Sequence, residues 1–267
     1  MTQGESGQDG DSNQSIWRGV DFSGLTLVLG AGGGRLVDVL AAQVRQADGH
    51  LAVVDYQIPA LRELVPEHGH SPQCLRARYR QLPLLAESVD LLVVNGVLRE
   101  APGSRYEALF DEFWRVLVQG GRLRVSDILE PTEADYDQAW HERNAIVRAL
   151  AALMDKPAAL SVDLTAAAKA LRQVGFEDLS VALLPGLALT DAWLEETVNA
   201  VHGMAARLAD RSQRDQIIER KVPNLIAAYA AGNQRAPERF VLSGRKVGSL
   251  ALDMESSFTE DDLLPEA

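Results

Sequence analysis

A glycine-rich loop stands where a nucleoside ligand could approach the backbone. Gly30-Ala31-Gly32-Gly33-Gly34 directly follows the apolar run at residues 25–29 and precedes a segment with apolar residues at helical spacing. Glycines at such a junction let a ligand come close to the main chain and to the positive end of the helix. Asp55 ends a second apolar run, and a carboxylate there can accept hydrogen bonds from both hydroxyls of a ribose. The loop and the acid together predict a nucleoside-binding site.

Two other interpretations of this pair stay open. The loop has the pattern G-x-G-x-G, whereas a dinucleotide fingerprint requires glycine where Arg35 stands, so a nicotinamide cofactor is the less favoured alternative. Alternatively, the glycines only form a tight turn and Asp55 only caps a helix. That interpretation predicts no nucleoside binding.

Other familiar catalytic patterns are missing from the sequence. It contains neither a G-x-S-x-G elbow nor a Gly-Lys-Ser/Thr phosphate loop, which argues against the usual hydrolases and nucleoside triphosphatases. The five histidines show no paired ligand spacing, and Cys74 is the only cysteine. We therefore expect no metal site and no internal disulfide.

Alternating short apolar runs and helical segments predict a doubly wound α/β fold with a Rossmann-like, seven-stranded sheet. Gly120-Gly121 is expected to end one helix, Asp163 or Thr165 to begin another, and Gly175 to end it. The expected strands are residues 25–29, 51–55, 74–80 (strand or loop), 89–95, 122–128, 179–184 and 238–246; the helices begin near residues 36, 59, 106, 133, 165 and 190.

Two helical insertions are expected in this fold, after the fifth and the sixth strand. They cover about residues 133–157 and 190–232, and the second is interrupted near residues 210–214 and by Pro223. The folded domain is expected over residues 19–248. Polar, acidic composition predicts disordered tails at residues 1–18 and 249–267.

The charge of the chain argues against two classes of partner. A formal net charge of -12 repels both a phosphate backbone and an anionic membrane surface, so we expect neither nucleic-acid nor membrane binding. Residues 1–14 lack an apolar stretch, so we expect neither a signal peptide nor a membrane anchor there, and no apolar run elsewhere is long enough to span a bilayer. A cytoplasmic protein in a reducing compartment is the expectation.

Several motifs resemble the class I S-adenosylmethionine-dependent methyltransferases, in particular the small-molecule branch with the quinone-biosynthesis and arsenite enzymes. The resemblance covers about residues 25–128. It is strongest in the segment EFWRVLVQGGRL at residues 112–123 and continues in Leu82-Pro83-Leu84 and the apolar run at 89–95. Weaker similarity follows at residues 165–184 and in the last strand.

The resemblance implies roles for individual residues. The loop would hold the methionine half of the cofactor, and the acid after the second strand would hold its ribose. The end of the fourth strand would face the methyl group. Possible bases near the fifth strand are Asp127, Tyr136 and His141, with His202 and Tyr106 as further candidates, although each also suits an ordinary packing or surface role. The implied cofactor residues are Gly30, Ala31, Gly32, Gly34, Asp55, Tyr56, Arg78, Asn95 and Gly96.

Two positions depart from the family pattern. Val28 replaces an acid that helps to hold the amino acid end of the cofactor, and Arg78 replaces an aspartate that accepts from the adenine amino group. Arginine cannot accept a hydrogen bond. Arg76, Arg78 and Arg80 alternate, so on a strand they would share one face, either as a site for an anion or a carboxylated cofactor, or as a solvated edge. Cofactor binding is thus expected to be weak, altered or lost.

Two functional hypotheses follow. The first is S-adenosylmethionine-dependent methyl transfer to a small or medium organic molecule; arsenite is disfavoured because Cys74 is the only thiol. The second is a catalytically silent methyltransferase-like subunit that binds a partner or a metabolite. In either case the helical insertions are expected to form a substrate lid or the surface of a homodimer or heterodimer.

Overall fold

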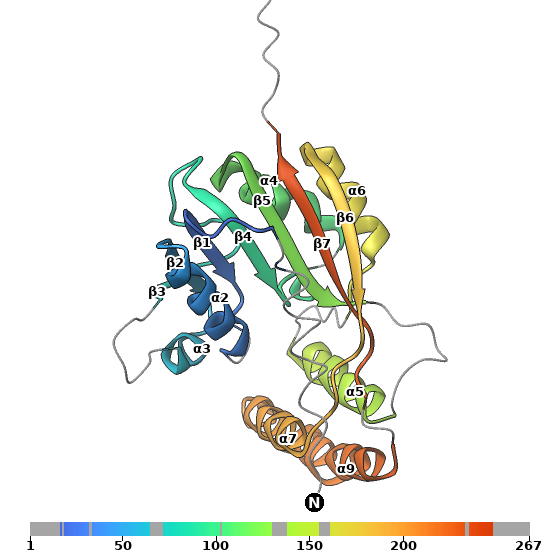
Figure 1. Cartoon of the computed structure of the whole chain (residues 1–267). Coiled ribbons are helices and arrows are strands. Elements are labelled where there is room, and N and C mark those ends of the chain that lie inside the picture. Colours follow the sequence, from blue (N-terminus) through green and yellow to red (C-terminus); the bar gives the residue numbers. More distant parts are fainter. Residues whose placement is uncertain are drawn as a thin grey trace, which may run out of the picture.

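A seven-stranded sheet with the strand order β3-β2-β1-β4-β5-β7-β6 forms the centre of the chain (Figure 1). The computed structural model describes residues 17, 19–31, 34–64, 72–101, 103–129, 138–154, 161–232 and 235–247. The two expected tails therefore lie outside the described residues, apart from Trp17. Strands β3, β2, β1, β4 and β5 are parallel, and β7 runs antiparallel between β5 and β6. The predicted α/β fold with a Rossmann-like sheet is confirmed.

The central strands are apolar because helices cover both of their faces. β1 (Leu25–Leu29), β2 (His50–Asp55) and β4 (Val89–Asn95) lie side by side and are almost entirely buried. On one face α2 (Arg35–Gln46) and α3 (Ile58–Glu63) enclose a core that includes Val28, Leu40 and Val53. On the other, α4 (Tyr106–Val116) and α6 (Leu164–Val174) pack on a core that includes Leu27 and Phe110.

The remaining strands complete the sheet on its two sides. β3 (Gln73–Arg76) is the edge strand beside β2, while β5 (Leu117–Ile128), β7 (Arg239–Lys246) and β6 (Phe176–Leu184) extend the other side. The expected strand at 74–80 thus ends at residue 76, and the expected helix at 59–68 is described only as far as residue 64.

The helical insertions form a second apolar core of their own. α5 (Gln138–Leu153), α7 (Asp191–Ala205), α8 (Arg211–Gln216), the π-helix η3 (Ile217–Lys221) and α9 (Val222–Ala231) pack around Ile146, Leu150 and Leu225. Figure 1 shows α5, α7 and α9 together beyond the ends of β4 and β5. No helix within the described ranges is long and apolar enough to cross a membrane.

Stacked aromatic rings join the helices of this second core. Trp140 stacks on Trp193 and Trp193 on Tyr229, each pair with ring centroids 6.2 Å apart. Tyr229 also donates a hydrogen bond from its hydroxyl to Asp191 Oδ1, at 2.8 Å. One rigid aromatic column therefore connects α5, α7 and α9.

Two sequence-based expectations about helix ends are wrong. α4 ends at Val116, and Gly120 lies inside β5 with a φ of 81°, where β5 advances five positions (117 to 122) while β4 advances two (89 to 91). Gly120 therefore shapes a bulge rather than a helix end. Pro223 does not end the helical run of residues 211–231 either; it lies in the first turn of α9, directly after the π-helix η3, so the hydrogen-bond pattern changes there while the chain stays helical.

Other helix ends agree with the sequence. Asp163 caps α6, its carboxylate accepting a hydrogen bond from Ala166 N at 3.0 Å, and Gly175 ends the helix with a φ of 110°. Asp210 caps α8 in the same way, which places the interruption of the second insertion at residues 206–210.

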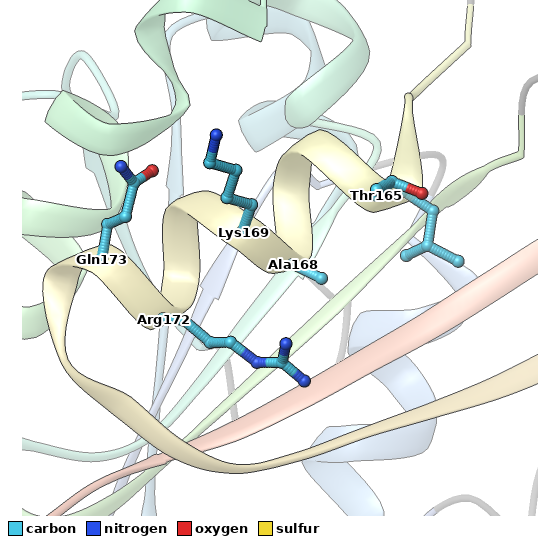
Figure 2. Close-up of a pocket in the computed structure, with 6 residues that line it drawn as sticks. Thr165, Ala168, Lys169, Arg172 and Gln173 are labelled. Atoms are coloured by element: carbon cyan, nitrogen blue, oxygen red, sulfur yellow. The ribbon is translucent and has the colours of Figure 1, made fainter.

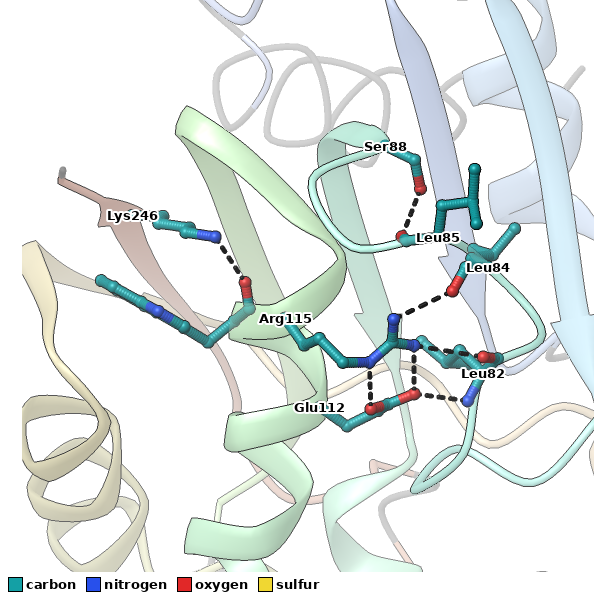
Figure 3. Close-up of polar contacts among 8 residues, drawn as sticks. Leu82, Leu84, Leu85, Ser88, Glu112, Arg115 and Lys246 are labelled. Atoms are coloured by element: carbon teal, nitrogen blue, oxygen red, sulfur yellow. Dashed lines mark hydrogen bonds and ion pairs between the residues drawn. The ribbon is translucent and has the colours of Figure 1, made fainter.

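An ion-paired network fastens the loop before β4 to α4 (Figure 3). Arg115 donates to Glu112 at 2.8 Å and also to the carbonyls of Leu82 and Leu84, while Glu112 accepts from Leu82 N at 2.6 Å. The side chain of Lys246, which is buried, donates to the carbonyls of Trp114 and Leu117 at the end of the same helix. These contacts fix where β4 and β5 begin.

Candidate cofactor and substrate site

The predicted cofactor residues meet at the carboxyl ends of three neighbouring strands. β1 lies between β2 and β4 in the sheet, and all three are parallel. Gly30, Asp55 and Asn95 therefore lie at one edge of the sheet. Ligands bind at this edge in open parallel sheets.

 The strand order alone brings Asp55 and Asn95, which are 40 positions apart in the chain, to the two sides of Gly30.

Gly30 lies where the end of β1 closely approaches the main chain of β4. Its φ is 85°, and its N–H donates to Val54 O at 3.1 Å, which ties the end of β1 to β2. A Cβ at Gly30 would fall on the main-chain oxygen of Asn95, far inside van der Waals contact. Gly34, with a φ of 81°, begins α2, whereas Gly32 and Gly33 lie outside the described residues.

Asp55 holds the loop in place. Its side chain is buried, with 5% of the residue exposed, and its Oδ2 accepts a hydrogen bond from Ala31 N at 3.0 Å. Its Oδ1 accepts from Gln57 N at 2.8 Å. Each carboxylate oxygen has two lone pairs, so both can still accept from a ribose hydroxyl. The donor and acceptor set at this edge therefore fits a nucleoside.

The aromatic and basic residues beyond Asp55 lie at the outer side of the site. Tyr56 is exposed and packs edge-on against Tyr79, with centroids 5.8 Å apart. Arg76 Nε donates to Tyr56 O at 3.4 Å. Arg78 and Arg80 follow β3 in a turn closed by a bond from Gln81 N to Arg78 O, so of the two alternatives, strand or loop, only Arg76 lies on the strand. All three are exposed, as a solvated edge requires.

On the other side of Gly30, the ends of β4 and β5 carry a buried ion pair. Asp127 has a fully buried side chain and accepts hydrogen bonds from Arg99 N at 3.2 Å and Ile128 N at 2.8 Å. The Arg99 guanidinium lies 3.6 Å from its carboxylate. Burial raises the pKa of Asp127, and the charge of Arg99 opposes that shift. Asp127 therefore positions the turn after β4, where Gly96 has a φ of 67°.

A second arginine with a shifted pKa lies in the helical insertion. Arg143 of α5 lies over the ring of Trp140, at 5.3 Å from the centroid, and donates to Asn144 Oδ1 at 2.9 Å. Burial, together with the like charge of Arg99, lowers the pKa of Arg143 to about 10. Neither arginine follows from a sequence motif. The only signals are the position of Arg99 just past the fourth strand and the three-residue spacing of Trp140 and Arg143 on one helical face.

The predicted bases are not brought together. Asp127 lies at the edge, but its carboxylate already accepts hydrogen bonds from Arg99 N and Ile128 N. His141 lies on α5 and is partly buried. Tyr106 is the first residue of α4 and is buried in the core, and His202 is exposed on α7. Tyr136 lies outside the described residues.

Two further observations bear on the choice of site. Within the described ranges, no group of three or more His, Cys, Asp or Glu side chains could hold a metal ion. A shallow hollow runs along α6, where Thr165, Lys169 and Arg172 point outward (Figure 2). Its lining comes from that helix alone, so it lies apart from the predicted nucleoside site at the loop and Asp55.

Comparison with known proteins identifies the domain. Residues 27–125 match the family model described as a methyltransferase domain. A stretch of 108 residues is 34% identical to the arsenite methyltransferase of Halobacterium salinarum. This match covers 39% of the chain and only 27% of that enzyme.

Solved structures extend the similarity to the whole fold. The phosphoethanolamine N-methyltransferase 2 of Haemonchus contortus, solved with S-adenosyl-L-methionine, has a TM-score of 0.53 at 14% identity and covers 90% of this chain and 52% of its own. A SAM-dependent methyltransferase from Archaeoglobus fulgidus has a TM-score of 0.51 at 10% identity, covering 89% and 92%. At such identities the structures show the fold alone. Residues 27–125 therefore match a methyltransferase domain in sequence, and most of the chain shares the fold of S-adenosylmethionine-dependent methyltransferases.

Proposed function

We propose that this protein binds S-adenosylmethionine and transfers its methyl group to a small or medium organic molecule. The observation that carries the proposal is the contact between Asp55 and Ala31, which joins the acid after β2 to the loop after β1. A buried carboxylate with spare lone pairs beside a glycine of positive φ suits a ribose lying over the loop.

Each part of the edge has a proposed role in holding the cofactor. The main chain of Gly30, Ala31 and Gly34 would contact the methionine half, while Asp55 would accept from the ribose hydroxyls. Tyr56 and Arg78 would border the adenine, and Asn95 and Gly96 the reacting carbon. When bound, the cofactor supplies an activated methyl group on a sulfonium, so the protein has mainly to align the acceptor in line with it. The insertion helices, which lie beyond the ends of β4 and β5, would exclude water from the site.

Val28 favours a second candidate, a catalytically silent subunit. The family acid at this position would help to hold the amino acid end of the cofactor, but Val28 is fully buried in the core beside α2. If a buried donor of the cofactor goes unpaired, the loss is about 1–3 kcal/mol, or about tenfold or more in affinity. Under this alternative, the insertions would bind a metabolite, a second copy or another subunit.

Calorimetric titration tests the first proposal. S-adenosylmethionine and S-adenosylhomocysteine should both bind to the full chain, and Asp55→Asn should weaken both at least tenfold because it loses the charge that accepts two hydroxyls. Asp111→Asn, which changes an exposed aspartate of α4, should bind as the wild type does. Equal binding by Asp55→Asn would contradict the proposed ribose contact.

Turnover separates the two candidates. Incubation with methyl-labelled cofactor and a panel of small organic acceptors should release S-adenosylhomocysteine if the chain is an enzyme. Cofactor binding without any release would favour the silent subunit. Arg78→Asp discriminates further: higher affinity for the cofactor would indicate that the site has degenerated, while loss of binding would make Arg78 a specialised contact.

A further inference from the structure

β6 is an open edge of the sheet. It is the last strand in the strand order, and among the described residues β7 is the only strand that pairs with it (Figure 1). Every second residue of such a strand turns its main-chain N–H and C=O away from the sheet, where another strand can pair with them. Proteins usually protect an edge of this kind with charged side chains, with proline or with a covering segment.

The edge formed by β6 lacks these protections. Residues 179–190 carry no charged side chain, although 24% of the whole chain is charged, and their single proline, Pro185, comes after the strand. The side chains are also uncovered, because Val181 is 47% exposed, Leu183 59% and Leu187, just beyond the strand, 45%. An uncharged, apolar and exposed edge is expected to pair with a further strand.

Val181 and Leu183 extend the core of the sheet to this edge. They lie opposite Leu242 and Phe240 of β7, and residues that face each other across antiparallel strands point to the same side of a sheet. Leu242 and Phe240 are fully buried in the core that α4 and α6 cover. The core on this face is therefore open to solvent at β6, and a strand with apolar residues at the same positions would cover it.

A second copy of β6 has the required pattern. When a two-fold axis normal to the sheet relates two β6 strands, they run antiparallel and their apolar faces lie on the same side. Val181 of one copy then packs near Leu183 of the other, and the reverse contact forms by symmetry. A closed dimer needs a surface that is complementary to itself in this way.

The charges at the two ends of β6 favour the antiparallel arrangement. Glu177 is exposed near the start of the strand, and Arg245, which lies opposite it, pairs with Asp178 instead. At the other end, Arg239 donates from its Nε to Pro185 O at 3.3 Å, and it lies on the same face as Glu177. Antiparallel pairing puts the Glu177 end of each copy beside the Arg239 end of the other, whereas parallel pairing would put like charges together.

We propose that the protein forms a two-fold dimer in which two β6 strands pair antiparallel and join the two sheets. The nine residues of β6 are about 30 Å long, so the edge and its side chains cover about 300–500 Å² of each copy. A stable interface covers about 800 Å² of each partner, so this dimer should dissociate at micromolar concentrations. It uses the edge of the sheet rather than the helical insertions, and it does not depend on the proposed methyl transfer.

Sedimentation velocity of the full chain over a wide range of micromolar concentrations tests dimer formation. The wild type should dimerise as its concentration rises. Val181→Lys and Leu183→Lys each place a charge on the exposed edge and should weaken the dimer at least tenfold. Leu85→Lys makes the same change at a side chain that is 81% exposed in the loop before β4, and it should dimerise as the wild type does.

Two results overturn the proposal. The first is a wild type that stays monomeric at every concentration, since the edge is then left to another segment of this chain or to a different protein. The second is a dimer that neither lysine variant weakens, because its interface must lie elsewhere. Circular dichroism establishes that each variant is folded.

Cross-linking tests the direction of the paired strands. Glu177→Cys chains and Leu187→Cys chains, both with Cys74→Ser to remove the native thiol, are mixed and treated with a short thiol cross-linker. Antiparallel pairing brings residue 177 of one copy near residue 187 of the other, so the cross-linked dimers should contain one chain of each kind. Cross-links only between chains of the same kind would indicate parallel strands and overturn the two-fold arrangement.

Discussion

Gly30→Ala and Gly120→Ala put the same methyl group on nearly the same backbone in two different surroundings. The φ angles are 85° and 81°, so each variant should lose about 1–2 kcal/mol from left-handed strain. At Gly120 nothing lies within 4 Å of the new Cβ. At Gly30 the Cβ would fall on Asn95 O, and the ends of β1 and β4 would have to separate.

The separation of β1 from β4 determines how much more unfolding free energy Gly30→Ala loses than Gly120→Ala. Forcing a methyl into a packed site costs about 1–3 kcal/mol, so Gly30→Ala should lose about 2–5 kcal/mol of unfolding free energy in all. For a domain of this size, each kcal/mol lowers the melting temperature by roughly 2–4 °C. Urea unfolding followed by circular dichroism measures both variants, and calorimetry measures their affinity for S-adenosylhomocysteine.

The paired design makes the result decisive. Gly30→Ala should be the less stable variant and should lose cofactor affinity, whereas Gly120→Ala should bind like the wild type because it lies at the opposite end of β5. Equal stability losses in the two variants would refute the close approach of β1 to β4 at Gly30.

Three further outcomes concern the contacts that hold β4 and β5. Glu112→Gln should cost about 1–2 kcal/mol at pH 7, because Arg115 then donates to a neutral acceptor. The hydrogen bond from Arg115 lowers the pKa of Glu112, so its stabilisation is present above the ordinary value of 4.5 and is lost as the pH falls through the lowered pKa. Urea unfolding from pH 7 to 3 should therefore show the difference from wild type shrinking in acid; a constant difference would contradict the assigned ion pair. Arg115→Lys should also destabilise, by about 1 kcal/mol, since lysine cannot reach the carboxylate and both loop carbonyls in one fork. Lys246→Met should cost about 2–4 kcal/mol by leaving the carbonyls of Trp114 and Leu117 unpaired, and a neutral result in thermal unfolding would exclude that role.

Local sequence patterns predicted the parts of the fold that depend on local chemistry. The apolar runs gave the central strands correctly because a parallel strand covered on both faces needs apolar residues throughout. Asp163 and Gly175 marked the ends of α6 because a cap is a contact within a few residues.

Features that depend on distant neighbours could not be predicted. Gly120-Gly121 looks like a helix end in sequence, but its place in a bulge depends on the pairing of β5 with β4. Arg99 and Asp127 are 28 positions apart and are in contact only because β4 and β5 end side by side in the sheet. The hydrogen bond between Asp55 and Ala31 was predictable only in part. The order of the strands predicted that the two residues would be near, but not that the buried carboxylate would accept a hydrogen bond from Ala31 N.

A crystal structure of the chain with S-adenosylhomocysteine tests the central claim most directly. The account predicts that the ribose lies over the loop after β1, with both of its hydroxyls about 2.5–3.0 Å from the carboxylate of Asp55. The homocysteine end should lie along Gly30 and Ala31. A ligand bound elsewhere, or a cleft at Asp55 that stays empty at saturating ligand, would contradict the assignment of this edge as the cofactor site.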